Sequence, residues 1–148
     1  MNKQRIAILI ACCIGSLASL MNWQDYFLTS TSGVELGYGW FTLGLFSIGG
    51  VICLVSNKTK QLTTIEILAT IIPAIMATGI AAFAYVKLQN TPAPIKKTEL
   101  DFIVELAKSY MSKTTLGVGL YITIVAGVAV PVLAFALKQK KEIIDDRK

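Results

Sequence analysis

Few side chains in this sequence could carry out chemistry, and the main candidates are three cysteines and two carboxylates. Cys12, Cys13 and Cys53 lie inside apolar stretches, where a thiol usually serves as a small packing residue. The sequence contains no histidine, so a zinc site built from cysteine and histidine lacks its parts. A phosphate-binding glycine loop and a paired acid and base are also missing. We therefore predict that the protein is not an enzyme and has no catalytic residue, metal site or cofactor.

The two carboxylates occupy different kinds of position. Glu35 lies among glycines in the stretch GVELGYGW, where it is either a solvated loop acid or a contact for a ligand or partner. Glu66 follows Thr63 at the Thr-x-x-Glu spacing of a helix capping box, in which each side chain bonds a free amide of the first turn. We interpret Glu66 as this cap in preference to a proton-relay group.

The elements that carry these residues are defined by where charge is missing. Only 16% of the 148 residues are charged, against about 25% in soluble domains. Four charge-free stretches, each of roughly 20 residues, match the length of helix that crosses the hydrocarbon core. They predict an all-α membrane protein, a four-transmembrane-helix bundle in a single domain covering residues 1–148. The predicted spans are 6–22, 38–57, 64–87 and 115–137.

The charges of the connecting segments predict the orientation of the bundle. Nine of the 14 Lys and Arg residues lie on the side of the two termini, and positive charge favours the cytoplasmic side. We therefore predict cytoplasmic termini, a cytoplasmic turn at 58–63, a cytoplasmic tail at 138–148, and outer loops at 23–37 and 88–114. The basic balance reflects this topology. It predicts no nucleic-acid partner, because a basic surface with aromatic platforms is missing.

Both outer loops are predicted to form local structure. The stretch LTSTSGVELGYG predicts a short hairpin closed around Ser32-Gly33. In the second loop, apolar residues recur at helical spacing from Thr98 onward, which indicates an amphipathic helix outside the membrane. Its apolar stripe is the best candidate surface for a partner helix, in competition with self-packing or contact with lipid. The candidate partner-binding residues are Leu100, Ile103, Val104, Ala107 and Met111, together with Glu35.

Aromatic residues mark the predicted membrane boundary, and small residues mark the predicted helix contacts. Trp23, Tyr26 and Trp40 flank the first outer loop, at the depth where such side chains anchor spans among lipid headgroups. Small residues recur every four positions along two spans, so another helix can approach closely. The predicted helix-packing residues are Ala11, Gly15, Ser19, Gly119, Thr123, Gly127 and Pro131. Packing within the monomer and packing between copies are both compatible with these stripes.

Trp23, Ser32-Gly33 and the stretch GYGWFTL together resemble the motifs of a broad group of small prokaryotic four-span membrane proteins of unknown function. In that group, a tryptophan after the first span leads through a Ser-Gly-rich loop to Gly-x-Gly-Trp at the start of the second. The later stretch GVGLYITIVAGV looks like the group's fourth span. The resemblance implies a bacterial or archaeal inner membrane and no particular activity. Claudins share four spans and an outer-loop tryptophan, but their paired outer-loop cysteines are missing here.

The spans contain few polar or ionisable side chains, and this favours one of the remaining classes of function over the other. We expect a non-enzymatic scaffold or accessory subunit of a larger membrane assembly, packing through its small-residue faces and the outer amphipathic helix. The alternative is an oligomeric channel or a component of a small-solute transporter. Such proteins usually carry ionisable residues or a polar path at membrane depth, whereas these spans offer only groups such as Ser16, Thr70 and Thr123. The expected partners are membrane lipid and other membrane subunits or further copies of the chain.

Overall fold

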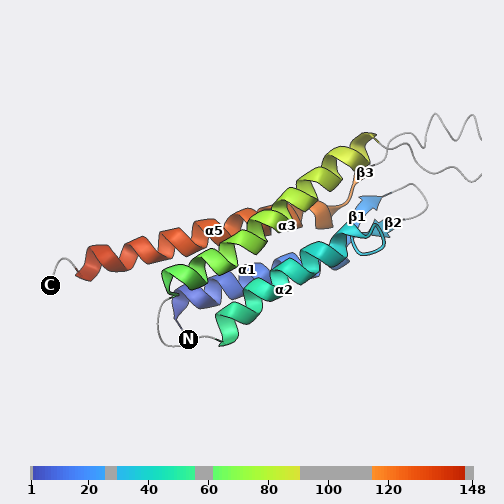
Figure 1. Ribbon diagram of the computed structural model, residues 1–148. Helices are drawn as coiled ribbons and strands as arrows, with labels where there is room; N and C mark the ends of the chain where they lie inside the picture. Colours follow the sequence, from blue (N-terminus) through green and yellow to red (C-terminus); the bar gives the residue numbers. More distant parts are fainter. Residues whose placement is uncertain (1, 26–29, 56–61, 91–114, 146–148) are drawn as a thin grey trace, which may run out of the picture.

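The computed structural model describes residues 2–25, 30–55, 62–90 and 115–145, and four long helices make up most of this part (Figure 1). Each helix is long and apolar enough to cross a membrane, the last one through Val118–Leu137. The protein is therefore a multi-pass helical membrane protein, as the charge-free stretches predict. The helices are α1 (Lys3–Leu20), α2 (Tyr38–Val55), α3 (Thr64–Asn90) and α5 (Val118–Asp145).

The four helices pack as a closed ring in which α1 and α3 lie on one diagonal. α1 contacts α2 and α5, and α3 contacts the same two helices. Both chain termini lie at one end of the bundle, called here the terminal end, and the strands lie at the opposite end, called the sheet end (Figure 1). At the terminal end, α5 continues beyond the other three helices.

Local capping determines where α1 and α3 begin. The Asn2 side chain accepts a hydrogen bond from the Gln4 amide at 3.0 Å and so caps α1. Before α3, the Thr63 amide donates to Glu66 Oε2 at 2.7 Å, and the Glu66 amide donates to Thr63 Oγ1 at 3.4 Å. The predicted capping box is thus confirmed. It satisfies two amides that no helical carbonyl reaches.

A small antiparallel sheet of order β2-β1-β3 covers the sheet end of the bundle. Its strands are β1 (Asn22–Asp25), β2 (Ser30–Ser32) and β3 (Thr115–Leu116). The hairpin predicted around Ser32-Gly33 is wrong in position, because Ser32 pairs with Asn22 and ends a strand. The Ser-Gly pair instead leads into the turn at 33–36 that follows β2. Since β1 also pairs with β3, the sheet joins the chain after α1 to the chain before α5.

Two glycines let the chain pass from this turn into α2. Gly37 has a φ of +82°, a conformation that residues with a Cβ rarely adopt. Gly39 is required for a different reason, which is close approach of the backbone. Its amide donates to the Gly33 carbonyl at 2.7 Å, and a Cβ at this position would overlap the backbone of Gly33 and Val34.

Apolar side chains fill the bundle in two clusters. The longer cluster includes Ile8, Phe46 and Val130 and runs between the helices, and the second contains Trp23 and Leu120 near the sheet end. Large apolar side chains are also exposed on the outward faces of all four helices. This is the distribution expected of helices whose surroundings are lipid, because burial in the bundle and contact with hydrocarbon both keep these side chains away from water.

Candidate functional site

The predicted helix-packing residues lie inside the bundle, where they bring neighbouring helices into contact. Six are buried and Pro131 is half-buried; the buried ones are Ala11, Gly15, Ser19, Gly119, Thr123 and Gly127. A Cβ on Gly15 would lie 2.7 Å from ring carbons of Phe46 on α2. A Cβ on Gly119 would lie 2.8 Å from the Ala18 carbonyl oxygen of α1. The stripes therefore serve contacts within one chain, between α1 and α2 and between α1 and α5.

Hydroxyl groups within the helices bond to their own backbone. Three threonines donate to the carbonyl four residues earlier, with oxygen–oxygen distances of 2.8–2.9 Å: Thr70, Thr78 and Thr123. Ser19 shares a hydrogen bond of 2.8 Å with Thr42 and so links α1 to α2. A Cβ on Gly127 would overlap the Thr78 hydroxyl, which shows that α5 closes directly over this group. These hydroxyls are satisfied inside the bundle and contribute to its packing.

A buried arginine at the terminal end lies outside the predicted site residues. Arg5 is only 1% exposed. Its Nη2 donates to Glu66 Oε2 at 3.2 Å, and its Nη1 donates to the Cys53 carbonyl at 3.4 Å. Glu66 therefore has two roles, as the cap of α3 and as the counter-charge of Arg5. The guanidinium joins the beginning of α1 to the beginning of α3 and the end of α2.

Gln4 makes a second set of bonds beside this ion pair. The side chain is 1% exposed, its Nε2 donates to the Ala134 carbonyl at 2.8 Å, and its Oε1 accepts from the Leu62 amide at 3.4 Å. It thus connects α1 to α5 and to the residues before α3. Because a buried amide needs partners for both its donors and its acceptor, these bonds favour one arrangement of the helices at this end.

A spacing in the sequence indicates the internal position of Arg5. The residue continues the stripe Ile8, Cys12, Gly15 and Ser19, whose members recur at intervals of three and four and are all buried. Such spacing places side chains on one face of a helix. The stripe therefore predicts that the Arg5 side chain faces the bundle, where a carboxylate would be needed to balance its charge.

The structure agrees with the predicted interfacial anchors for some residues and not for others. The prediction is wrong for Trp23, which is fully buried: its indole N–H donates to the Ala18 carbonyl at 3.0 Å, and Gly33 lies close against the ring. The physical reason is that β1 begins directly after α1 and lies between β2 and β3, so the indole packs into the apolar cluster with Ala81, Ala84 and Leu120. Trp40 is 62% exposed on the first turn of α2, the position expected of an anchor. Tyr26 lies outside the described residues.

Of the predicted partner surface, the structure describes Glu35 alone. Its Oε2 accepts from the Ser32 amide at 2.7 Å, and its own amide donates to Ser32 Oγ at 3.3 Å. This reciprocal pair stabilises the turn after β2, and the side chain is otherwise exposed, which favours the interpretation of a solvated loop acid. The predicted amphipathic helix and its stripe lie outside the described residues; the stripe comprises Leu100, Ile103, Val104, Ala107 and Met111.

The cysteines are unlinked thiols in the helices. Cys12 and Cys53 are buried and Cys13 is exposed on the outward face of α1. Over the described ranges, no three histidine, cysteine, aspartate or glutamate side chains come together as metal ligands. The geometry thus gives Cys12 and Cys53 the surroundings of packing residues in the core.

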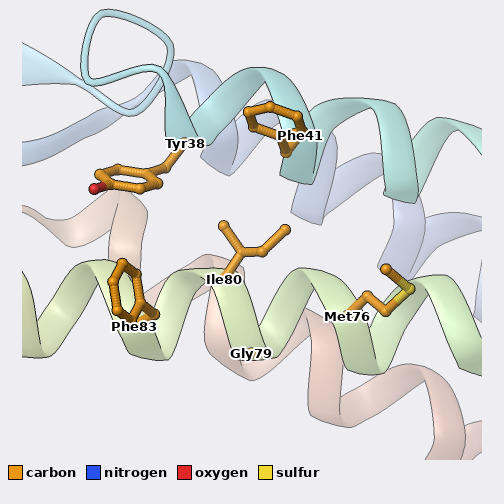
Figure 2. A pocket seen from close by; sticks show the side chains of 6 residues that line it. All are labelled: Tyr38, Phe41, Met76, Gly79, Ile80 and Phe83. Carbon is orange, nitrogen blue, oxygen red and sulfur yellow. The ribbon is translucent and has the colours of Figure 1, made fainter.

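An open apolar groove lies between α2 and α3 in the half of the bundle nearer the sheet end (Figure 2). Its volume is about 470 Å³, and its lining residues are Tyr38, Phe41, Met76, Gly79, Ile80 and Phe83. The Tyr38 ring packs edge-on against Phe83, with ring centroids 6.3 Å apart. The Tyr38 hydroxyl accepts a hydrogen bond from Lys87 Nζ at 3.0 Å. The groove therefore combines an apolar floor with a polar, positively charged end.

In the part of the chain that the structure describes, four long helices define a multi-pass membrane protein, and buried side chains hold these helices together. No protein-family model, no curated protein and no solved structure matches this chain. The functional argument consequently rests on the chemistry and geometry of its own residues.

Proposed function

We propose that this protein is a non-enzymatic scaffold or accessory subunit of a larger membrane assembly. We place it in a prokaryotic inner membrane with both termini in the cytoplasm. The observation that supports this proposal is the type of side chain found in the interior of the bundle. In the described spans, the interior consists largely of small residues, apolar side chains and hydroxyls bonded to their own helices. An interior of this kind provides stability, so we assign the function to the surfaces.

The positions of the charged side chains favour the subunit over the alternative of a channel or transporter component. Within the described spans, charged side chains occupy only the first or last turn of a helix: Lys3, Arg5, Glu66 and Lys87. Channels and transporters commonly place ionisable groups or a polar path at membrane depth. The charged side chains of these described spans instead lie at helix ends.

Fewer surfaces are available to a partner subunit than the sequence alone suggests. Small-residue faces that could have received another subunit are occupied inside the chain, as Gly15 and Gly119 show. The segment 91–114 runs from the end of α3 to β3, and β3 is paired with β1. The described residues on either side of that segment, the end of α3 and β3, lie at the sheet end of the bundle. We infer that its predicted apolar stripe is the docking surface for the partner.

Purification of the tagged full chain from its native membrane in mild detergent, followed by native mass spectrometry, tests this proposal. We expect a distinct second polypeptide at fixed stoichiometry. Ile103→Glu should lower its recovery about tenfold, because a charge in an apolar contact costs at least 1.4 kcal/mol. Ser109→Glu is the matched control, since it adds the same charge to the polar face of the predicted helix.

Two outcomes would count against the proposal. Equal recovery of the partner with Ile103→Glu and Ser109→Glu would remove the stripe as the docking surface. A homo-oligomer without other subunits that conducts ions in liposomes would overturn the subunit role and support the channel.

A further inference from the structure

The groove between α2 and α3 and the lysine beyond its end together have the length of one membrane leaflet. Lys87 lies 11 residues after Met76, which corresponds to about 16 Å along a helix at 1.5 Å per residue. Half of a hydrocarbon core about 30 Å thick is about 15 Å. The groove runs from Tyr38 to Met76 (Figure 2). Together with Lys87, which bonds the Tyr38 hydroxyl, it corresponds to the distance from the headgroups to about the middle of the bilayer.

We propose that this groove binds one anionic phospholipid, with an acyl chain against α2 and α3 and the phosphate at Tyr38 and Lys87. The lipid belongs to the leaflet at the sheet end. This site goes beyond the proposed subunit role and does not depend on it.

The apolar part of the groove is shaped to receive a chain. Gly79 leaves it open, because a Cβ at this position would meet no atom within 4 Å. Phe41, Met76 and Phe83 flank the opening with exposed fractions of 67%, 54% and 61%. A volume of about 470 Å³ lies within the range of about 300–1,000 Å³ typical of ligand pockets. Flexible lipid tails fill such a hollow without the loss of any bond made by the protein.

The polar end of the groove matches a phosphate group. The Tyr38 hydroxyl accepts a hydrogen bond from Lys87 and still carries its own O–H donor. A phosphate oxygen that accepts this donor lies beside the ammonium charge, and hydrogen bonds to an ionised acceptor are about twice as strong as neutral ones. The edge-on contact with Phe83 holds the Tyr38 ring in place. In Figure 2, the hydroxyl lies at the end of the groove opposite Met76.

The extent of the groove favours a lipid over a transmembrane partner helix. A helix packed between α2 and α3 would contact both of them through the two leaflets, whereas the hollow ends near the bilayer centre. A lipid chain occupies one leaflet, and its headgroup carries the negative charge that the Tyr38–Lys87 pair complements.

Native mass spectrometry of the detergent-purified full chain, titrated with phosphatidylglycerol, measures this binding. Gly79→Leu should weaken binding at least tenfold, because the new side chain occupies the groove. Gly44→Leu is the matched control and should leave the affinity unchanged, since a Cβ at Gly44 also meets no atom within 4 Å and the residue lies outside the groove. Tyr38→Phe keeps the ring and removes the hydroxyl, so it should weaken phosphatidylglycerol binding about fivefold and leave binding of a diacylglycerol with the same chains unchanged.

Several results would overturn the site. Unchanged affinity in Gly79→Leu, or the same loss in Gly79→Leu and Gly44→Leu, would show that the groove does not bind the lipid. Equal effects of Tyr38→Phe on phosphatidylglycerol and diacylglycerol would remove the phosphate contact. A dimer that dissociates on the Gly79→Leu substitution would assign the groove to a second copy of the chain. Circular dichroism establishes that each variant is folded, and Tyr38→Phe tests the site independently of any change in packing at Gly79.

Discussion

Replacing Gly15 with alanine should destabilise the bundle, even though alanine is the better helix former. The new Cβ would lie 2.7–2.8 Å from three ring carbons of Phe46, whereas carbon atoms normally pack at about 3.5–4.0 Å. Phe46 is 1% exposed, so its ring is enclosed by neighbouring side chains and has little space into which it can move. Overpacking of this kind costs about 1–3 kcal/mol, and alanine recovers up to about 1 kcal/mol of helix propensity.

Gly44→Ala is the matched control, because a Cβ there meets no atom within 4 Å. It should stabilise the protein by up to about 1 kcal/mol. The two variants should therefore differ by about 1–3 kcal/mol in free energy of unfolding, measured by titration with sodium dodecyl sulfate in mixed micelles and followed by circular dichroism. Adding Phe46→Leu to Gly15→Ala should recover part of the loss, since the smaller side chain leaves room. Equal unfolding free energies for the two alanine variants would refute the proposed contact.

Three further predictions concern the ends of the bundle. Glu66→Gln should lower the free energy of unfolding by about 1.5–3 kcal/mol, because the ion pair between the buried arginine of α1 and this carboxylate is lost. Glu35→Gln, in an exposed turn with similar bonds, should cost less than about 1 kcal/mol in the same titration, and equal losses would contradict the role of the ion pair. Gly37→Ala should cost roughly 1–2 kcal/mol, because its φ of +82° disfavours a Cβ although space is available; unchanged stability would show that the turn does not need this conformation. With one tryptophan retained at a time, brominated lipid should quench the fluorescence of Trp40 strongly and that of Trp23 weakly, since their exposed fractions are 62% and 0%. Equal quenching would disprove the burial of Trp23.

The sequence is informative about the helices because the hydrocarbon core excludes charge along a whole span. It is less informative about where a helix ends. α1 begins at Lys3, before the predicted span 6–22, and α3 continues to Asn90, past the predicted 64–87. These helices extend through polar residues because backbone bonds and caps, such as that of Asn2, determine their ends.

The parts of the site that the sequence did not indicate depend on residues far apart in the chain. Arg5 and Glu66 are separated by 61 residues, and each has a sufficient local explanation, as a topology charge and as a helix cap. Their pairing becomes visible only when α1 and α3 are placed together. The burial of Trp23 likewise follows from the pairing of β1 with a strand that precedes α5. A surface aromatic and a buried one have the same sequence signal at the end of a span.

The central claim is that the interior of the bundle is sealed against water, so that function belongs to the surfaces. Cys12 tests this directly, because it lies near the middle of α1 and is 3% exposed. The test uses membrane vesicles that contain the protein with both Cys13→Ala and Cys53→Ala. A membrane-impermeant maleimide, added to either side of the membrane, should leave Cys12 unmodified until the protein is denatured. A Ser30→Cys variant without native cysteines should react in the folded state, because Ser30 is exposed in β2. Modification of Cys12 in the folded protein at a rate close to that at position 30 would place water at the centre of the bundle and contradict the account.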